Sequence, residues 1–275
     1  MKIAFLDFWP GFQPKNNFFF YLLRDNFEKV KLVRPRFADV IFFSCFGNEH
    51  KDKKFDNKKK IYYTGENISP NFDQADISLS FEFNDHEGKN YRLPLWLLHI
   101  DWFNVKSYNN PDWLIPKKYL NSSNPFFFKN KNKFCSIVYS TESEQRKKII
   151  DLISTIEKVD VYGKVEGGEF LKEGEYEKLD VLSNFSFSLA LENSISSGYH
   201  TEKLLHAKVA GNIPLYYGAD TVSEDFNKDS FINITSKKTE EIIEIVNQLQ
   251  NDSKKRQSIL EEPFFNKDLD LNDLS

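Results

Sequence analysis

"FSFSLALENSISSGYHTEKLLHAKVAGNIPLYYG", residues 185–218, contains one strand-like run, one helical run and a second strand-like run in that order. The apolar run FSFSLAL predicts a buried strand. The segment TEKLLHAKVAG predicts a helix that ends at Gly211, because glycine is favoured just after a helix. IPLYYG then predicts the second strand. A strand, a helix and a strand in succession are typical of a parallel sheet with helical crossovers.

The same alternation extends in both directions from this stretch. FCSIVYS and VDVYG before it predict strands, and TESEQRKKIIDLIS and EYEKLDVLS predict helices. Thr141 and Glu144 have the spacing of a capping box at the start of the first of these helices. After it, FINI predicts a strand and residues 239–250 predict a helix, and residues 256–275 form a polar tail.

The N-terminal half repeats the pattern. KIAFLDF, KVKLV, DVIFFSCF, KIYYTG and DISLSFEF predict strands, and NNFFFYLLRDNF predicts a helix. A polar stretch interrupted by prolines, residues 109–132, separates the two halves and is the candidate linker. We therefore expect an α/β fold of two Rossmann-like domains facing an interdomain cleft, with limits at 1–125 and 126–255 and a C-terminal tail at 256–275.

Composition excludes several classes of protein. The net charge of −4 gives no global electrostatic footprint for nucleic acid. No run of about 18 apolar residues is present to cross a membrane. The N-terminal MKIAFLDFWPGF is too short for a signal peptide and is interrupted by Asp7 and Pro10. Since Cys45 and Cys135 are the two cysteines, the chain fits a reducing compartment. We expect a cytoplasmic protein with no nucleic-acid partner.

Polar side chains gather where the strand FSFSLAL ends. Glu192 and Asn193 follow it directly, at the position where open α/β sheets bind their ligands. The next helix opens near Thr201, and its unpaired N–H groups and positive dipole end form an anion site. Lys203 lies in the first turn, where a cation is unfavourable unless an anion is near. The pattern therefore predicts a phosphate-containing ligand.

Plainer interpretations of the same residues stay open. Glu202 is suited to accept hydrogen bonds from ribose hydroxyls, but it also compensates the helix dipole at this position. Glu192 and Asn193 are suited to form a turn at the end of the strand.

A second carboxylate follows a strand in the N-terminal half. In "IYYTGENISPNF", residues 61–72, Glu66 comes directly after an apolar run and before a proline turn. This placement directs Glu66 toward the expected cleft. The alternative is a turn residue, which the neighbouring Gly65 and Asn67 favour.

Other ligand motifs are missing. No G-x-G-x-x-G follows the first strand, and there is no Walker A sequence. The five histidines have no zinc spacing. Asp268 and Asp270 form an Asp-x-Asp pair, but they lie in the polar tail, where a solvated segment is the expected structure. We therefore expect no metal site.

Two blocks of sequence resemble one enzyme family. The core E-N-x(5)-Y-x-T-E-K, with a later x-x-P-x-Y-x-G, closely resembles the donor-binding signature of the α-1,3/4-fucosyltransferases, glycosyltransferase family 10. YYTGENISPNF is similar to the family's N-terminal acceptor-domain motif, and YRLPLW lies where a similar segment follows it. The resemblance covers residues 61–96 and 133–235. It implies a GT-B fold of two Rossmann-like domains, GDP-fucose as donor, and inversion at the anomeric carbon.

The resemblance also implies roles for single residues. Glu66 matches the general base, and Asn193 lies inside the donor signature. Arg146 matches a phosphate-binding arginine in a shorter block. The positions that match GDP contacts are Tyr199, Glu202 and Lys203. His200 departs from the family pattern, which usually has an apolar residue there.

These matches imply a fucosyltransferase that acts on an oligosaccharide or glycolipid acceptor, in surface polysaccharide or lipopolysaccharide synthesis. Lys203, Arg146 and the helix start would neutralise the leaving diphosphate, so we expect transfer without a metal or other cofactor. Two alternatives stay open: a transferase that uses another GDP-deoxysugar, and a non-catalytic protein that binds sugar nucleotides or glycans. Peripheral association with the inner face of a membrane also stays open.

Overall fold

Two parallel β-sheets, of six and five strands, form the framework of the chain. The computed structural model describes residues 1–120, 124–171, 174–267, 269 and 271. The sheets lie in separate compact units, Met1–Pro116 and Lys117–Leu269. No helix in the described ranges is long and apolar enough to cross a membrane. The predicted α/β fold with parallel sheets is confirmed. The domain limits at 1–125, 126–255 and 256–275 stay a prediction.

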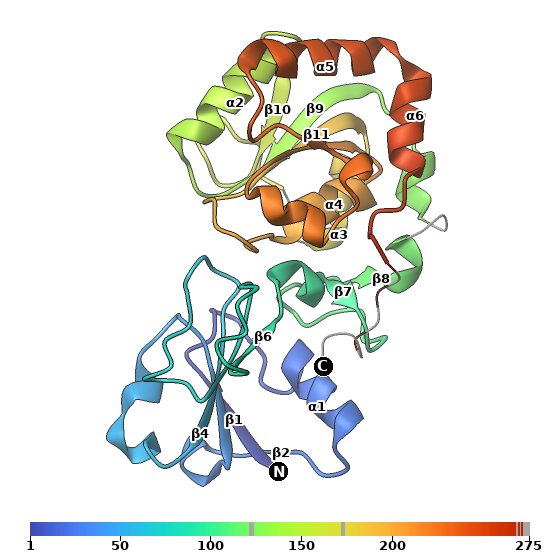
Figure 1. Cartoon of the computed structure of the whole chain (residues 1–275). Coiled ribbons are helices and arrows are strands. Elements are labelled where there is room, and N and C mark those ends of the chain that lie inside the picture. The colour runs from blue at the N-terminus through green and yellow to red at the C-terminus, as the bar shows by residue number, and fades with distance from the viewer. Residues whose placement is uncertain (121–123, 172–173, 268, 270, 272–275) are drawn as a thin grey trace. The chain divides into compact units, whose positions relative to one another are not determined.

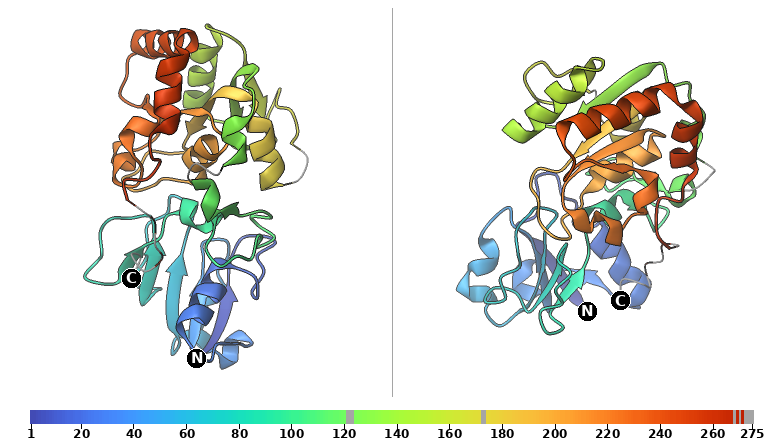
Figure 2. Two further views of the ribbon diagram at one scale, coloured as in Figure 1. Left: turned by 90° about the vertical axis from the view of Figure 1, so that its right-hand side faces the viewer. Right: turned by 45° about the horizontal axis from the view of Figure 1, so that its top comes forward.

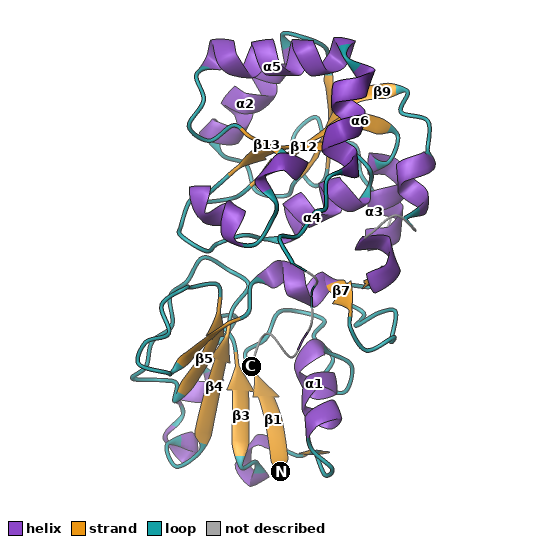
Figure 3. Ribbon diagram, turned by 45° about the vertical axis from the view of Figure 1, so that its right-hand side comes forward, coloured by secondary structure: helices purple, strands orange, loops and turns teal. Residues whose placement is uncertain are grey.

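The first unit is a six-stranded sheet in the order β2-β1-β3-β4-β5-β6, with every pairing parallel. Its strands are β1 Lys2–Leu6, β2 Lys31–Leu32, β3 Val40–Phe43, β4 Lys59–Tyr63, β5 Ile77–Ser80 and β6 Asn90–Arg92. The arrows of β1, β3, β4 and β5 in Figure 3 point the same way. The loops that follow these strands therefore leave the sheet along one edge. A separate parallel pair is formed by β7 Ile100–Asp101 and β8 Ile115–Pro116.

One α-helix, α1 (Phe18–Asn26), occurs in residues 1–116, all of which are described. Asn17 caps it by accepting a hydrogen bond from the Phe20 N–H at 2.9 Å. The other connections are loops or short 3₁₀ helices: Pro35–Phe37, Glu49–Lys51, Lys53–Phe55 and Leu95–His99. The one helix predicted in this half, within NNFFFYLLRDNF, is confirmed as α1.

The second unit has a five-stranded sheet in the order β10-β9-β11-β12-β13, again parallel throughout. Its strands are β9 Lys133–Val138, β10 Val159–Tyr162, β11 Phe185–Leu191, β12 Ile213–Tyr217 and β13 Ile232–Asn233. Its helices are α2 Glu144–Ser154, α3 Glu175–Leu182, α4 Glu202–Val209, α5 Thr239–Asn251 and α6 Ser253–Glu261. Short 3₁₀ helices cover Lys117–Leu120, Pro125–Phe128, Asp220–Glu224 and Lys228–Ser230.

Helices cover both faces of this second sheet. Figures 1 and 2 show α2 and α5 on one face and α3 and α4 on the other. The α2 and α5 side packs on a buried cluster to which β11 contributes Phe187, Leu189 and Leu191. Because side chains alternate along a strand, the small residues Ser188 and Ala190 face the opposite side, where α4 contacts β11. The alternation of large and small side chains along β11 therefore distinguishes the two faces that these helices cover.

Several local details differ from the sequence analysis. The α2 helix is capped by Ser143, whose hydroxyl accepts from the Arg146 N–H at 3.2 Å, so the capping box predicted from Thr141 is wrong. The α6 helix was not predicted. Gly211 does end α4, with φ of +72°. Asp268 and Asp270 lie outside the described residues.

Candidate functional site

Glu192 is the first residue after β11, and its side chain is completely buried. Its carboxylate accepts hydrogen bonds from the Thr201 N–H and from the Thr201 hydroxyl, both at 2.7 Å. Its own N–H donates to the Tyr217 carbonyl at 2.8 Å, which continues the β11–β12 ladder by one residue. Thr201 occupies the predicted N-cap position of α4, but its side chain makes no capping bond. Glu192 therefore fastens the start of α4 to the end of β11.

Lys203 completes this arrangement. Its ammonium lies 3.2 Å from Glu192 Oε2 and 2.9 Å from Thr201 Oγ1. Burial alone would lower the pKa of Lys203, but the charge of Glu192, with smaller effects from Glu202 and Tyr199, raises it above its usual value. The anion that a lysine at this position requires is thus supplied by the protein. The position of Lys203 in the first turn of α4 is therefore not, by itself, evidence for a bound phosphate.

Lys203 does not use all of its hydrogen-bonding capacity within the described residues. An ammonium has three N–H donors, and the described residues accept from Lys203 at Glu192 and Thr201. The side chain is also 17% exposed. One charged donor is therefore left for an anion at the carboxyl edge of the sheet.

Arg146, on α2, is 2% exposed and connects three segments. Its guanidinium donates to the carbonyls of Thr141 and of Leu191, and to Asn193 Oδ1 at 2.8 Å. It also lies 4.8 Å from the centre of the Tyr139 ring. Burial lowers the pKa of Arg146, and Tyr139 and Glu192 act in the opposite direction. The structure thus brings together Arg146 and Asn193, which the sequence analysis had assigned to one ligand.

Some hydrogen-bonding capacity of Arg146 is unused. Its Nε is buried and has no hydrogen-bond partner among the described residues. A buried donor without a partner costs free energy, and a ligand oxygen would satisfy it. Through its hydrogen bond to Asn193, Arg146 holds that residue at the end of β11.

The loop between β11 and α4 carries the other predicted site residues. Tyr199 is buried, Glu202 is partly exposed in the first turn of α4, and Asn193 is exposed. His200 is buried and lies 2.6 Å from Asp225 Oδ2 through Nδ1 and 3.2 Å from Thr221 Oγ1 through Nε2.

Thr221 also accepts from the Gly198 N–H at 3.0 Å. His200 therefore anchors the loop that carries Tyr199. The sequence showed His200 only as a departure from the family pattern and gave no sign of its partners.

Glu66 belongs to the first unit, three residues beyond the end of β4. Its N–H donates to Thr64 Oγ1 at 2.9 Å, and its carbonyl accepts from the Ile68 N–H at 2.8 Å. A side chain at Gly65 would lie only 2.9 Å from Leu95 Cδ1, so the turn before Glu66 packs tightly. The Glu66 residue itself is exposed. A fixed backbone thus presents a solvent-accessible carboxylate at the carboxyl edge of the first sheet.

Family profiles match both halves of the chain. Residues 3–99 match the alpha-(1,3)-fucosyltransferase FucT N-terminal domain. Residues 128–261 match the C-terminal part of glycosyltransferase family 10, described as fucosyltransferase. The chain belongs to glycosyltransferase family 10. The resemblance inferred from the donor signature and from the Glu66 motif is thereby confirmed at the level of the family.

Curated members of family 10 are similar over different lengths. The alpha-(1,3)-fucosyltransferase FucT of Helicobacter pylori is 28% identical over 261 residues, which cover 85% of this chain and 54% of the relative. The 4-galactosyl-N-acetylglucosaminide 3-alpha-L-fucosyltransferase 9 of Bos taurus is 32% identical over 119 residues, 41% of this chain and 32% of the relative. The chain spans about half the length, or less, of the curated relatives that it matches.

Solved structures match nearly the whole chain. An alpha1,3-fucosyltransferase aligns over 95% of this chain and 81% of its own, with 27% identity and a TM-score of 0.77. The structure of an alpha1,3-fucosyltransferase with GDP-fucose aligns over 97% and 82%, with 25% identity and a TM-score of 0.73. The Anabaena protein HepE, at 11% identity and a TM-score of 0.56 over 95% and 93%, shares the fold. Together these matches confirm the GT-B class of α/β fold.

Proposed function

We propose that this family 10 chain transfers fucose from GDP-fucose to a hydroxyl of an acceptor glycan, with inversion at the anomeric carbon. The observation that carries the proposal is the set of cationic and polar side chains at the carboxyl edge of the second sheet. Arg146 and Asn193 meet there beside Lys203 and its partner Glu192. The solved structure with GDP-fucose aligns with 97% of this chain, which supports the same donor here.

The donor would bind through its diphosphate and its nucleoside. The remaining N–H of Lys203 and the unpaired donors of Arg146 suit phosphate oxygens, since charge-assisted hydrogen bonds are the strong ones. N–H groups in the first turn of α4 add positive potential at the same place. Glu202, partly exposed in that turn, would accept from ribose hydroxyls, and Tyr199 and Asn193 would contact the rest of the nucleotide.

The reaction we propose is a direct displacement. Glu66 takes the proton from the acceptor hydroxyl while that oxygen forms a bond to the anomeric carbon of fucose. The bond from this carbon to the β-phosphate oxygen breaks, and its electron pair leaves with GDP. A carboxylate can act as base because the hydroxyl becomes acidic only as the new bond forms. Lys203 and Arg146 stabilise the charge that develops on the diphosphate.

The acceptor class and cellular role belong to the same proposal. We propose an α-1,3 or α-1,4 linkage to an oligosaccharide or glycolipid in surface polysaccharide or lipopolysaccharide synthesis, in the cytoplasm and with peripheral access to the inner face of the membrane. The test incubates the purified chain with GDP-fucose and either N-acetyllactosamine or a lipopolysaccharide core oligosaccharide. Mass spectrometry detects a fucosylated product, and NMR assigns its anomeric configuration and linkage.

Each outcome of that test points to one candidate. An α-linked fucose on either acceptor is the expected result. In a parallel incubation with another GDP-deoxysugar, transfer from that sugar and not from GDP-fucose would replace the donor in the proposal. GDP-fucose binding without turnover on any acceptor would favour the non-catalytic sugar-nucleotide-binding protein.

Lys203→Ala is expected to weaken GDP binding by about 1.5–3 kcal/mol, the range for a hydrogen bond to a charged group. Guanosine lacks phosphates, so its affinity should stay near the wild-type value. Calorimetric titration with both ligands checks this, and Lys228→Ala, an exposed lysine of the same unit, is the control. Equal losses for GDP and guanosine would show that Lys203 supports the fold and does not contact phosphate.

Transfer is expected to continue in excess EDTA, with Mn²⁺ or Mg²⁺ changing the initial rate only modestly. The donor set at the second sheet is cationic, which suits a diphosphate and does not suit a divalent metal. Rising ionic strength should slow transfer at low donor concentration, because partly exposed charges are screened over about 8 Å at 0.15 M salt. Loss of activity in EDTA that a divalent ion restores would refute the metal-independent mechanism.

A further inference from the structure

The loop after β1 holds a group of aromatic side chains at the carboxyl edge of the first sheet. The rings of Phe8 and Phe12 stack at 4.1 Å, and Trp9 packs edge-on against Phe12 at 5.1 Å. All three are partly exposed, whereas aromatic residues of a core would be buried. Exposed apolar side chains that lie together are typical of a recognition site. The carboxyl edge of a parallel sheet is where open α/β folds bind their ligands.

The loop after β3 adds to this surface. Phe46, in the loop after β3, is 46% exposed and its ring lies 6.4 Å from that of Trp9. The Phe46 N–H donates to the Asp7 carbonyl at 3.0 Å, which ties the two loops together. Trp9 also lies 6.4 Å from Tyr63, the last residue of β4. Glu66 lies three residues beyond Tyr63, in the loop that follows β4.

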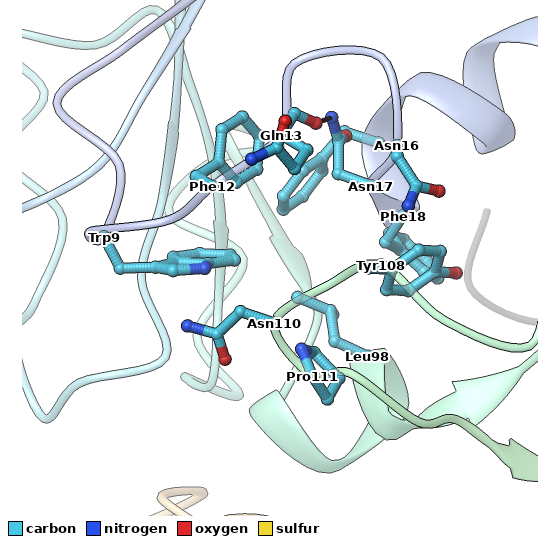
Figure 4. Close-up of a pocket in the computed structure, with 11 residues that line it drawn as sticks. Trp9, Phe12, Gln13, Asn16, Asn17, Phe18, Leu98, Tyr108, Asn110 and Pro111 are labelled. Atoms are coloured by element: carbon cyan, nitrogen blue, oxygen red, sulfur yellow. Dashed lines mark hydrogen bonds between the residues drawn. The ribbon is translucent and has the colours of Figure 1, made fainter. Parts of the chain in front are cut away.

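Polar groups surround a small hollow beside Trp9. Figure 4 shows Trp9 and Asn110 on one side of it and Asn16 and Tyr108 on the other. Among the described residues, none accepts a hydrogen bond from the Trp9 indole, and none forms a hydrogen bond with the Asn110 side-chain amide. The Gln13 side chain forms one hydrogen bond, from Nε2 to the Gly11 carbonyl at 3.3 Å. The volume of about 10 Å³ is roughly the space of one water molecule, so a single hydroxyl group fits it.

We propose that this surface, the Trp9 platform, binds one neutral sugar ring of the acceptor next to Glu66; the proposal rests on the transferase function and specifies its acceptor site. Every residue that lines the hollow is uncharged, which suits a neutral ring and not a phosphate or a sugar acid. A pyranose offers an apolar C–H face that stacks on the indole. It also offers hydroxyls that match the amides of Gln13 and Asn110. Small-molecule sites typically combine an aromatic or apolar surface with a small number of oriented polar groups.

The platform is tested by acceptor kinetics with N-acetyllactosamine at saturating GDP-fucose. Trp9→Ala is expected to raise the acceptor KM about tenfold or more, as for a central aromatic anchor. Asn110→Ala should raise it about three- to tenfold, the effect of one neutral hydrogen bond. Trp9→Phe, which keeps an aromatic ring, should recover most of the affinity.

Controls separate acceptor binding from folding and from donor binding. Phe37→Ala removes a side chain that is 54% exposed but lies before β3, at the amino edge of the sheet, and should leave the acceptor KM unchanged. The KM for GDP-fucose should stay near wild type in every variant. An unchanged acceptor KM in both Trp9→Phe and Trp9→Ala, or an equal rise in Phe37→Ala, would overturn the proposal.

A binding measurement without donor keeps this proposal distinct from the transferase function. A saturation-transfer NMR titration of N-acetyllactosamine with the wild-type chain should give a dissociation constant that Trp9→Ala raises about tenfold or more. If the wild type transfers no fucose but binds the disaccharide through Trp9, the transferase proposal fails and the platform stands. Absence of binding in the wild type, or an unchanged dissociation constant in Trp9→Ala, would overturn the platform.

Discussion

Replacing Glu66 by glutamine is expected to lower turnover about 100-fold or more, while the affinity for GDP stays near its wild-type value. General bases typically contribute a factor of 10² to 10⁴. The amide has the shape of the carboxylate but cannot take the acceptor proton. Glu66 is exposed, and its backbone is held by Thr64, so the substitution should leave the turn and the stability of the chain intact.

The measurement compares kcat with N-acetyllactosamine or the active glycan acceptor, and GDP affinity by calorimetry. Glu49→Gln is the matched control, because Glu49 is an exposed carboxylate in the loop after β3 of the same sheet. It should keep wild-type turnover. A Glu66→Gln enzyme with near-normal turnover would remove Glu66 from the role of base. A parallel fall in GDP affinity would show instead that Glu66 acts on the donor.

The elements that sequence predicts well are those with strong local patterns. In the second unit each predicted strand has an apolar run, and α2 and α5 each have an apolar stripe, so the type and order of these elements follow from periodicity. The α6 helix has no buried residue, which is why its sequence SKKRQSILE carries no such stripe. In the first unit the connections after β3 are loops or short 3₁₀ helices, whose short length gives no periodic signal.

The sequence predicted which residues belong to the candidate site better than it predicted the contacts between them. Arg146 and Tyr199 were assigned from the family resemblance, whereas Glu66 and Lys203 were also singled out by their places after a strand and at a helix start. Neither kind of signal carries information about contacts. The sequence analysis places Glu192 in the ligand site, with a turn residue as the alternative, whereas Glu192 is the buried anion between β11 and α4. Such pairings join residues that are distant in sequence, as Arg146 and Asn193 are, and no local pattern reveals them.

Breaking the Glu192–Lys203 pair is expected to have the largest effect on stability. Lys203→Met would leave the completely buried Glu192 carboxylate without its cation, which costs about 3–5 kcal/mol of unfolding free energy for a buried pair. Glu192→Gln should cost less, about 1–3 kcal/mol, because Lys203 is partly exposed and can turn toward water. The double variant should lose clearly less than the sum, with a coupling above about 1 kcal/mol.

Urea denaturation of the four proteins at pH 7 and pH 9 measures this coupling. The pKa of Lys203 is raised in the folded chain, so its contribution is complete below the unfolded pKa of a lysine and is lost only as pH rises beyond it. The coupling should therefore be equal at the two pH values. Additive losses would mean that the pair, although close, contributes no net stability.

The same variants separate the structural role of Lys203 from its proposed role in binding. Glu192→Gln keeps the lysine and removes the carboxylate that competes for it, so GDP affinity should be retained or increased. Lys203→Met removes the charge and should weaken GDP but not guanosine. If both variants lost GDP affinity equally, Lys203 would serve the donor site only by holding Glu192 and the start of α4. A selective loss in Lys203→Met would place its third N–H on the diphosphate, as the transferase mechanism requires.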